Sequence, residues 1–267
     1  MQDTEITPGS ARLRETVLGS PSEIRDFLPV LKWLLVNCVV VLAFLVLWYF
    51  GLITAILNTD RTRVSLLIAA IFVLTAFHCL FQTYEVSREL VISRRNREII
   101  SRGSVGNYRA VDGRVFTESG IELEAGIMAS HIANLIRKAT LQDHKAFDQT
   151  LLLRALADKL RNREKLGLFV SEALLRLALL GTAIGFILML IPISQLNSFD
   201  AETLRTALTG MTTGMAVALN VTVSGIASAL VLKFEYYLLD GAIGELFDVI
   251  TETTEVNVVP ALIKDRA

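Results

Sequence analysis

Hydroxyl and amide side chains are concentrated in one apolar stretch in the last quarter of the chain. The stretch covers residues 208–232, and its polar members include Thr212, Thr213, Asn220, Thr222 and Ser224. Polar groups at membrane depth usually face a bundle interior or a wet cavity, because lipid offers them no hydrogen-bond partner. The pattern therefore favours an ion path over a lipid anchor. For any single threonine, helix packing is the alternative.

Glycines accompany these polar residues in both of the last two apolar stretches. Gly181 and Gly185 lie in the first stretch, and Gly214 and Gly225 lie in the second. Small residues let helix backbones approach closely in a membrane, where burial of apolar surface gives no drive for association. We therefore predict that these four glycines pack the two helices together.

Sequence signatures of enzymes and metal sites are missing. The chain has no Walker-type phosphate loop, no Gly-x-Ser-x-Gly elbow and no His-Glu-x-x-His. His131 and His144 are too far apart to form a metal site on one helix face, and Cys38 and Cys79 do not join them. His78 has no acidic or histidine partner within a helical turn, which favours a packed histidine over a proton relay. We predict no enzyme activity, no bound metal and no cofactor.

The elements that must position the polar residues follow from the distribution of hydrophobicity. The chain has 267 residues, of which 52% are hydrophobic and 20% are charged, so the apolar residues must be gathered in blocks. Four blocks reach the roughly 20 residues that a spanning helix needs. They cover residues 31–57, 64–81, 168–193 and 208–232. The formal net charge of -1 argues against a nucleic-acid partner.

These blocks predict an all-α integral membrane protein with four transmembrane helices in two hairpins. Its expected parts are a leader (1–30), a first hairpin (31–83), a cytoplasmic segment (84–167), a second hairpin (168–232) and a cytoplasmic C-terminal helix (233–267). The first block is expected to be an anchor rather than a signal peptide, because no small-residue cleavage site follows it.

The cytoplasmic segment should be mainly helical. Residues 101–126 contain five glycines and are expected to form a loop with short strands near 114–117. Residues 127–166 are expected to be helical. In the C-terminal helix, Phe234 and Tyr237 are placed on the apolar side and Glu235 and Asp240 elsewhere.

The charge distribution predicts the orientation in the membrane. A cluster of arginines, beginning at Arg88, follows the second block directly. Positive charge beside a span stays in the cytoplasm, so both termini and the segment 84–167 should be cytoplasmic.

At Leu179–Gly185 the sequence reads Leu-Leu-Gly-Thr-x-x-Gly, and at Gly214–Gly225 it reads Gly-Met-Ala-Val-Ala-x-x-x-Thr-x-x-Gly. With these two motifs in order, the chain resembles the MotA/TolQ/ExbB family of proton-channel subunits over roughly residues 166–247. Two leading spans resemble the flagellar stator subunit MotA. Thr182 and Thr222 fall on the family's two threonines, and the resemblance implies that they line the ion path, with Asn220 and Ser224 as further candidates.

The resemblance also implies partners. Five copies of such a subunit surround a dimer of a single-span protein of the MotB/TolR/ExbD type, whose aspartate carries the ion. Glu172 and Glu235 are placed near the span ends, so this chain is expected to need that partner's carboxylate. It further implies a multi-pass protein of the bacterial inner membrane that translocates H⁺, with Na⁺ less favoured.

A group of charges lies where the flagellar subunit has its cytoplasmic torque surface. The candidates for a torque or partner surface are Arg88, Arg94, Arg95, Arg97 and Glu98. A solvated polar face is the simpler alternative.

The sequence thus predicts the ring-forming ion-channel or stator subunit of a rotary motor driven by the proton motive force. Two alternatives stay open. One is a four-span scaffold or sensor that conducts no ions, and the other is a motor subunit similar to that of the Zorya phage-defence system.

Overall fold

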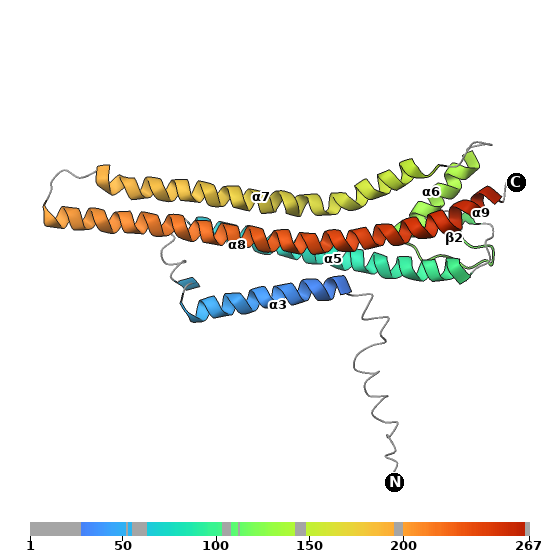
Figure 1. The fold of residues 1–267 in the computed structure, drawn as a ribbon, viewed down its shortest axis with the longest axis horizontal. Helices are drawn as coiled ribbons and strands as arrows, with labels where there is room; N and C mark the ends of the chain where they lie inside the picture. The colour runs from blue at the N-terminus through green and yellow to red at the C-terminus, as the bar shows by residue number, and fades with distance from the viewer. Residues whose placement is uncertain are drawn as a thin grey trace, which may run out of the picture. The chain divides into compact units, whose positions relative to one another are not determined.

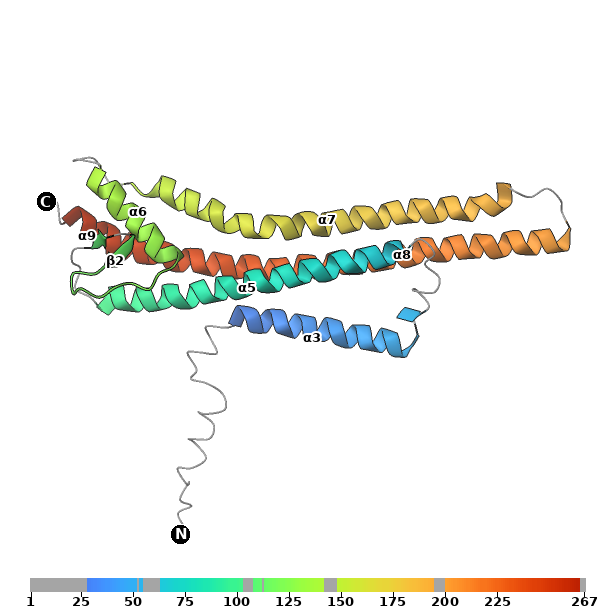
Figure 2. The same ribbon diagram turned by 180° about the vertical axis from the view of Figure 1, so that it is seen from behind.

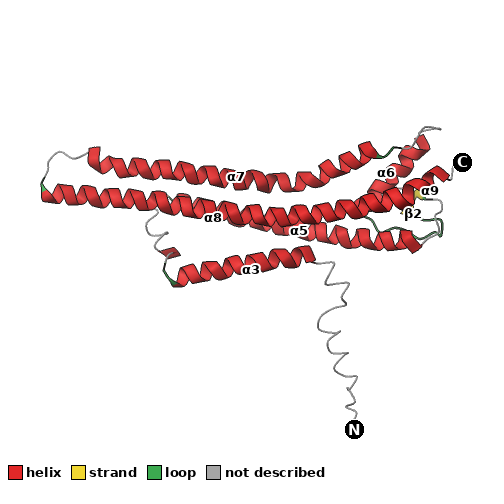
Figure 3. Cartoon of the chain, viewed as in Figure 1, coloured by secondary structure: helices red, strands yellow, loops and turns green. Residues whose placement is uncertain are grey.

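The computed structural model describes residues 28–51, 53–54, 63–102, 108–111, 113–141, 148–194 and 200–264. About 89% of these residues are helical, as predicted (Figures 1 and 3). The leader before residue 28 and most of the turn expected at Asn58–Arg63 lie outside the described residues.

Four helices are long and apolar enough to cross a membrane, which confirms that part of the prediction. They are α3 (Leu28–Tyr49), α5 (Val64–Arg102), α7 (Thr150–Ser194) and α8 (Ala201–Thr253). The last three have 39, 45 and 53 residues, about twice the roughly 20 that a bilayer requires. Each of these three helices therefore continues beyond its apolar part into a polar part. Their insertion as two hairpins stays a prediction.

The region between α5 and α7 contains a strand pair and one further helix. Strand β1 (Arg109–Val111) pairs antiparallel with β2 (Arg114–Phe116). Strand β2 lies where short strands were expected, whereas β1 lies before that position. Gly113 has a φ of 79° in the connecting turn, a conformation that glycine adopts without steric cost.

Residues 127–166, expected to be helical throughout, are interrupted. Helix α6 (Ile127–Leu141) ends well before α7 begins at Thr150. The carboxylate of Asp148 accepts a 2.8 Å hydrogen bond from the backbone N–H of Thr150, which marks the start of α7. A hydrogen bond from the Thr150 hydroxyl, followed by this backbone bond, lowers the pKa of Asp148. The helix that carries the third apolar block therefore begins eighteen residues before the predicted span.

The contacts divide the chain into two compact units, and α5, α7 and α8 each contribute to both. In the unit formed by residues 1–32, 83–160 and 241–267, α6 packs on β1, β2 and α9 (Val259–Lys264). The side chain of Asn96 both donates to the carbonyl of Glu124 and accepts from its N–H, each at 2.9 Å. Glu89 accepts from the N–H of Ile127 at 2.8 Å, which places an anion at the N-terminus of α6.

A π-helical turn, Thr254–Val258, separates α8 from α9. Pro260 follows it, and a proline inside a helix has no N–H and clashes with the carbonyl four residues earlier. The wider turn accommodates this break.

The other unit comprises residues 33–82 and 161–240. Its core is formed by buried side chains of α5, α7 and α8, namely Ile68, Ala76, Leu174, Val217, Val221, Ala229 and Leu232. Seen from two opposite sides, α7 and α8 lie side by side (Figures 1 and 2).

Candidate functional site

Helices α7 and α8 pack antiparallel through the predicted glycines. Added Cβ atoms would meet a neighbouring side chain or backbone at four levels, where Gly181 faces Val221, Gly185 faces Ala218, Gly214 faces Met189 and Gly225 faces Ala178. At Gly185 the added atom would lie 2.5 Å from the Ala218 Cβ, and at Gly214 it would lie 2.5 Å from the Met189 nitrogen. Real Cβ atoms essentially never come this close, so the contact requires glycine.

Thr182 and Thr222 lie at the same level of this helix pair, because each directly follows one of the contacting residues Gly181 and Val221. Both are half-buried. Each hydroxyl donates to its own helix, Thr182 to the Leu179 carbonyl at 2.6 Å and Thr222 to the Ala218 carbonyl at 2.8 Å. The oxygen lone pairs remain able to accept a hydrogen bond from water or a protonated acid.

Asn220 and Ser224 do not share a face with Thr222. They are four residues apart and so lie on one side of α8, while Thr222 is two residues from each and points about 200° away. Both are half-buried. The four residues expected along an ion path are therefore at similar levels of α8 and α7 but do not all line one surface.

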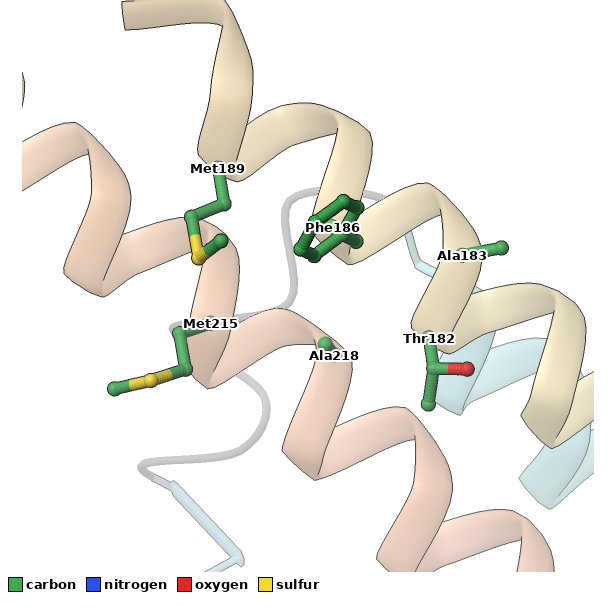
Figure 4. A pocket seen from close by; sticks show the side chains of 6 residues that line it. All are labelled: Thr182, Ala183, Phe186, Met189, Met215 and Ala218. Atoms are coloured by element: carbon green, nitrogen blue, oxygen red, sulfur yellow. The ribbon is translucent and has the colours of Figure 1, made fainter. Parts of the chain in front are cut away.

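A surface pocket of about 420 Å³ adjoins Thr182. Its lining comes from α7 and α8, and consists of Thr182, Ala183, Phe186, Met189, Met215 and Ala218 (Figure 4). Thr182 supplies the one side-chain oxygen in this lining. The pocket is thus an apolar hollow with a single hydroxyl at its edge, suited to an apolar side chain more than to a polar ligand.

The depth of Thr222 can be measured from the start of α5 or from the start of α8, and the two results differ. The ring Nδ1 of His78 and the hydroxyl of Tyr236 are 2.8 Å apart. Helices α5 and α8 run in the same direction, and Val64 and Thr222 each precede this contact by fourteen residues. Thr222 is therefore level with the first residue of α5, whereas about 32 Å of α8 separates it from Ala201. The mid-membrane position expected for Thr182 and Thr222 stays a prediction.

His78 belongs to a polar chain that sequence reasoning missed. Besides the Tyr236 contact, its Nε2 lies 3.5 Å from the Gln82 side-chain nitrogen, and Arg163 donates to the Gln82 oxygen at 3.5 Å. Tyr236 is buried, and its ring fills the space left by Gly167. A search for partners within one helical turn of His78 could not detect residues of α7 and α8, because they are distant in the sequence.

Glu235 lies on the buried side of α8, in contrast to its expected position, and its side chain is fully buried. Asn37 of α3 donates to Glu235 Oε1 at 3.0 Å. Phe234 and Tyr237, placed on the apolar side, are instead exposed at 48% and 69%. The sequence does indicate the buried side of α8, because apolar residues recur there at three- and four-residue spacing. They are Leu232, Tyr236, Leu239, Ile243, Leu246 and Ile250.

The candidate torque surface is largely engaged in ion pairs within the chain. Arg94 contacts Glu245 at 2.5 Å, and Arg97 contacts Glu252 at 3.0 Å. Two further pairs join Arg95 to Glu124 and Arg102 to Glu98. Arg88 is exposed. Arg94 and Arg97 thus attach α5 to α8, in addition to any contact with another protein.

Among the described residues, no three His, Cys, Asp or Glu side chains are grouped so that they could hold a metal ion. Comparisons with protein families, with curated proteins and with solved structures find no match. The four long apolar helices suggest a multi-pass membrane protein.

Proposed function

We propose that this chain is the ring-forming subunit of an ion-driven rotary motor similar to the MotA/TolQ/ExbB proteins. Several copies, five by that resemblance, surround a dimer of a single-span partner of the MotB/TolR/ExbD type. The translocated ion is H⁺, with Na⁺ less favoured. The membrane is the bacterial inner membrane, with both termini on the cytoplasmic side.

One observation carries the proposal. Two threonines, Thr182 and Thr222, lie at one level of a helix pair whose close packing depends on glycine. A carboxylate at membrane depth is costly when charged, and nearby hydroxyls can hydrogen-bond it or the water that serves it. Each unit charge that crosses a potential of 100 mV releases about 2.3 kcal/mol, so several crossings can drive a mechanical step.

The exposed surface of the same helices supports assembly into a ring. Large apolar side chains of α7 and α8 are open in the single chain, including Phe186, Leu219 and Val223. In a bilayer such residues face lipid or a helix of a neighbouring copy. The apolar pocket beside Thr182 can accept apolar side chains of another helix.

Reconstitution tests this proposal directly. The chain is co-expressed with a single-span, aspartate-containing protein of the MotB/TolR/ExbD type, and the complex is placed in vesicles under an imposed potential. We expect proton uptake that requires both proteins and stops when the partner's aspartate is replaced by asparagine. Native mass spectrometry should give several copies of this chain per complex. A chain that remains monomeric with the partner, or a complex that conducts no ions, would contradict the proposal.

A further inference from the structure

Glu235 is a fully buried acid outside the proposed ion path. Its side chain has no exposed surface, and thirteen residues separate it from Thr222, which is about 20 Å along α8. Its Oε1 atom accepts the 3.0 Å hydrogen bond from Asn37, and its Oε2 atom has no hydrogen-bond partner among the described residues. Within the described part of the chain, Oε1 is thus paired and Oε2 is not, although the indole of Trp33 lies beside the carboxyl group.

The contact with Asn37 sets the depth of this acid relative to the first apolar helix. Asn37 is nine residues from Leu28 and twelve from Tyr49, the two ends of α3. At 1.5 Å per residue these distances are about 14 Å and 18 Å. Glu235 is therefore level with the middle of α3 rather than with either of its ends.

The groups that face Glu235 are neutral. On α3 they are Asn37 and the indole of Trp33, and on α8 the neighbour is Tyr236, whose hydroxyl contacts His78 of α5. Cys79 of α5 is buried beside Tyr236. Among the described residues, no lysine or arginine forms an ion pair with Glu235, and Lys233 is exposed on another side of α8.

A buried carboxylate without a cation is strongly unfavourable, and such a group takes up a proton instead. We propose that Glu235 is a proton-binding site of this chain, in which the neutral acid joins α8 to α3 through Asn37. The proposal does not depend on the ion path at Thr182 and Thr222, because the site is complete within one chain.

The residues around Glu235 also include a hydrogen-bond donor for its ionised form. Trp33 is buried, and its indole Nε1 has no hydrogen-bond partner among the described residues. An ionised carboxylate accepts at both oxygens, so Asn37 and Trp33 could each donate to one of them. Pro29 and Trp33 are the buried side chains of α3. Loss of the proton from Glu235 would therefore add a second hydrogen bond between α8 and α3.

Infrared spectroscopy of the purified chain at neutral pH tests the site without any partner. The wild type should show the C=O band of a protonated carboxylic acid, and Glu235→Gln should lose this band. Glu172→Gln is the matched control, because Glu172 is exposed and paired with Arg176 at 3.3 Å. It should leave the acid band unchanged and reduce only the carboxylate signal.

A second variant covers the case in which Glu235→Gln does not fold. Asn37→Leu removes the donor to Oε1, so the acid band should remain but move to higher frequency. The proposal is overturned if the wild type has no protonated-acid band, or if the band is the same in Glu235→Gln. If Asn37→Leu does not shift the acid band, the band belongs to another residue. None of these outcomes bears on proton uptake through the complete complex.

Discussion

Gly181 of α7 lies so close to Val221 of α8 that an added Cβ atom would come within 2.2 Å of the valine Cγ1. This approach places Thr182 and Thr222, the next residues on each helix, at one level. The packing of the helix pair and the position of its hydroxyls thus depend on the same small residue.

Replacing a contact glycine should separate the helices. We expect Gly185→Ala to destabilise the protein by roughly 1–3 kcal/mol, since its methyl group would overlap Ala218. Thermal unfolding in detergent measures the change. Gly244→Ala is the matched control, because nothing lies within 4 Å of a Cβ atom there. Gly244 lies within α8, where alanine should be neutral or stabilising by up to about 1 kcal/mol. Equal effects of the two substitutions would contradict the packing role.

Removing the threonine hydroxyls should affect ion-driven function far more than folding. Thr182→Val and Thr222→Val keep the branched shape, and the lost hydrogen bonds run only to carbonyls of the same helix. We expect intact expression and assembly with severe loss of proton uptake in vesicles. Thr206→Val, which loses the same kind of bond at the beginning of α8, is the control. Full activity of both variants would refute the ion-path assignment, and disassembly would indicate a packing role.

Asn96 should be essential for the loop that follows α5. Asn96→Leu leaves the backbone N–H and carbonyl of Glu124 without their part-buried partner, at a cost of about 0.5–1.5 kcal/mol for each hydrogen bond. Arg95→Gln alters an exposed 3.4 Å ion pair with the same glutamate and should change stability by less than about 1 kcal/mol. The rate of limited proteolysis between α5 and α6 is compared for the two variants, and it should rise only in Asn96→Leu. Similar cleavage rates would show that Asn96 does not hold this loop.

Acid should destabilise the unit that contains α6 through His131. Burial lowers the pKa of this histidine below its ordinary 6.5, and Gln149 offsets the shift in part. The unfolded chain then binds a proton more readily than the folded one. Stability should therefore fall as the pH drops from about 6.5 toward the lower folded pKa. His131→Leu should flatten this part of the unfolding-temperature profile, and an unchanged profile would assign the effect to other groups.

Labelling of single cysteines tests the orientation. In a Cys38→Ser background, Cys79 is buried and should react slowly. Ser101→Cys is exposed in the segment expected in the cytoplasm, and Glu202→Cys is exposed at the beginning of α8. An impermeant maleimide added to intact cells should label Glu202→Cys and should not label Ser101→Cys. Labelling of Ser101→Cys would reverse the predicted topology.

Local sequence predicted the four long apolar helices and short strands near residues 114–117. Apolar blocks of spanning length predicted α3, α5, α7 and α8, since block length and composition are properties of consecutive residues. The glycines of α7 and α8 were also recognisable, because small residues stand out in an apolar run. The break between α6 and α7 was missed, since it depends on a local cap at Asp148 within a weak helical pattern.

Tertiary structure decided which polar residues are paired and which acid is buried. Spacing within one helix can identify a partner only one or two turns away, whereas His78, Glu235 and Arg94 have partners more than 150 residues distant. The sequence by itself determined that four apolar helices exist and that two carry small and hydroxyl residues. The register between helices, which brings Asn37 to Glu235, arises from the fit of side chains across their contacts.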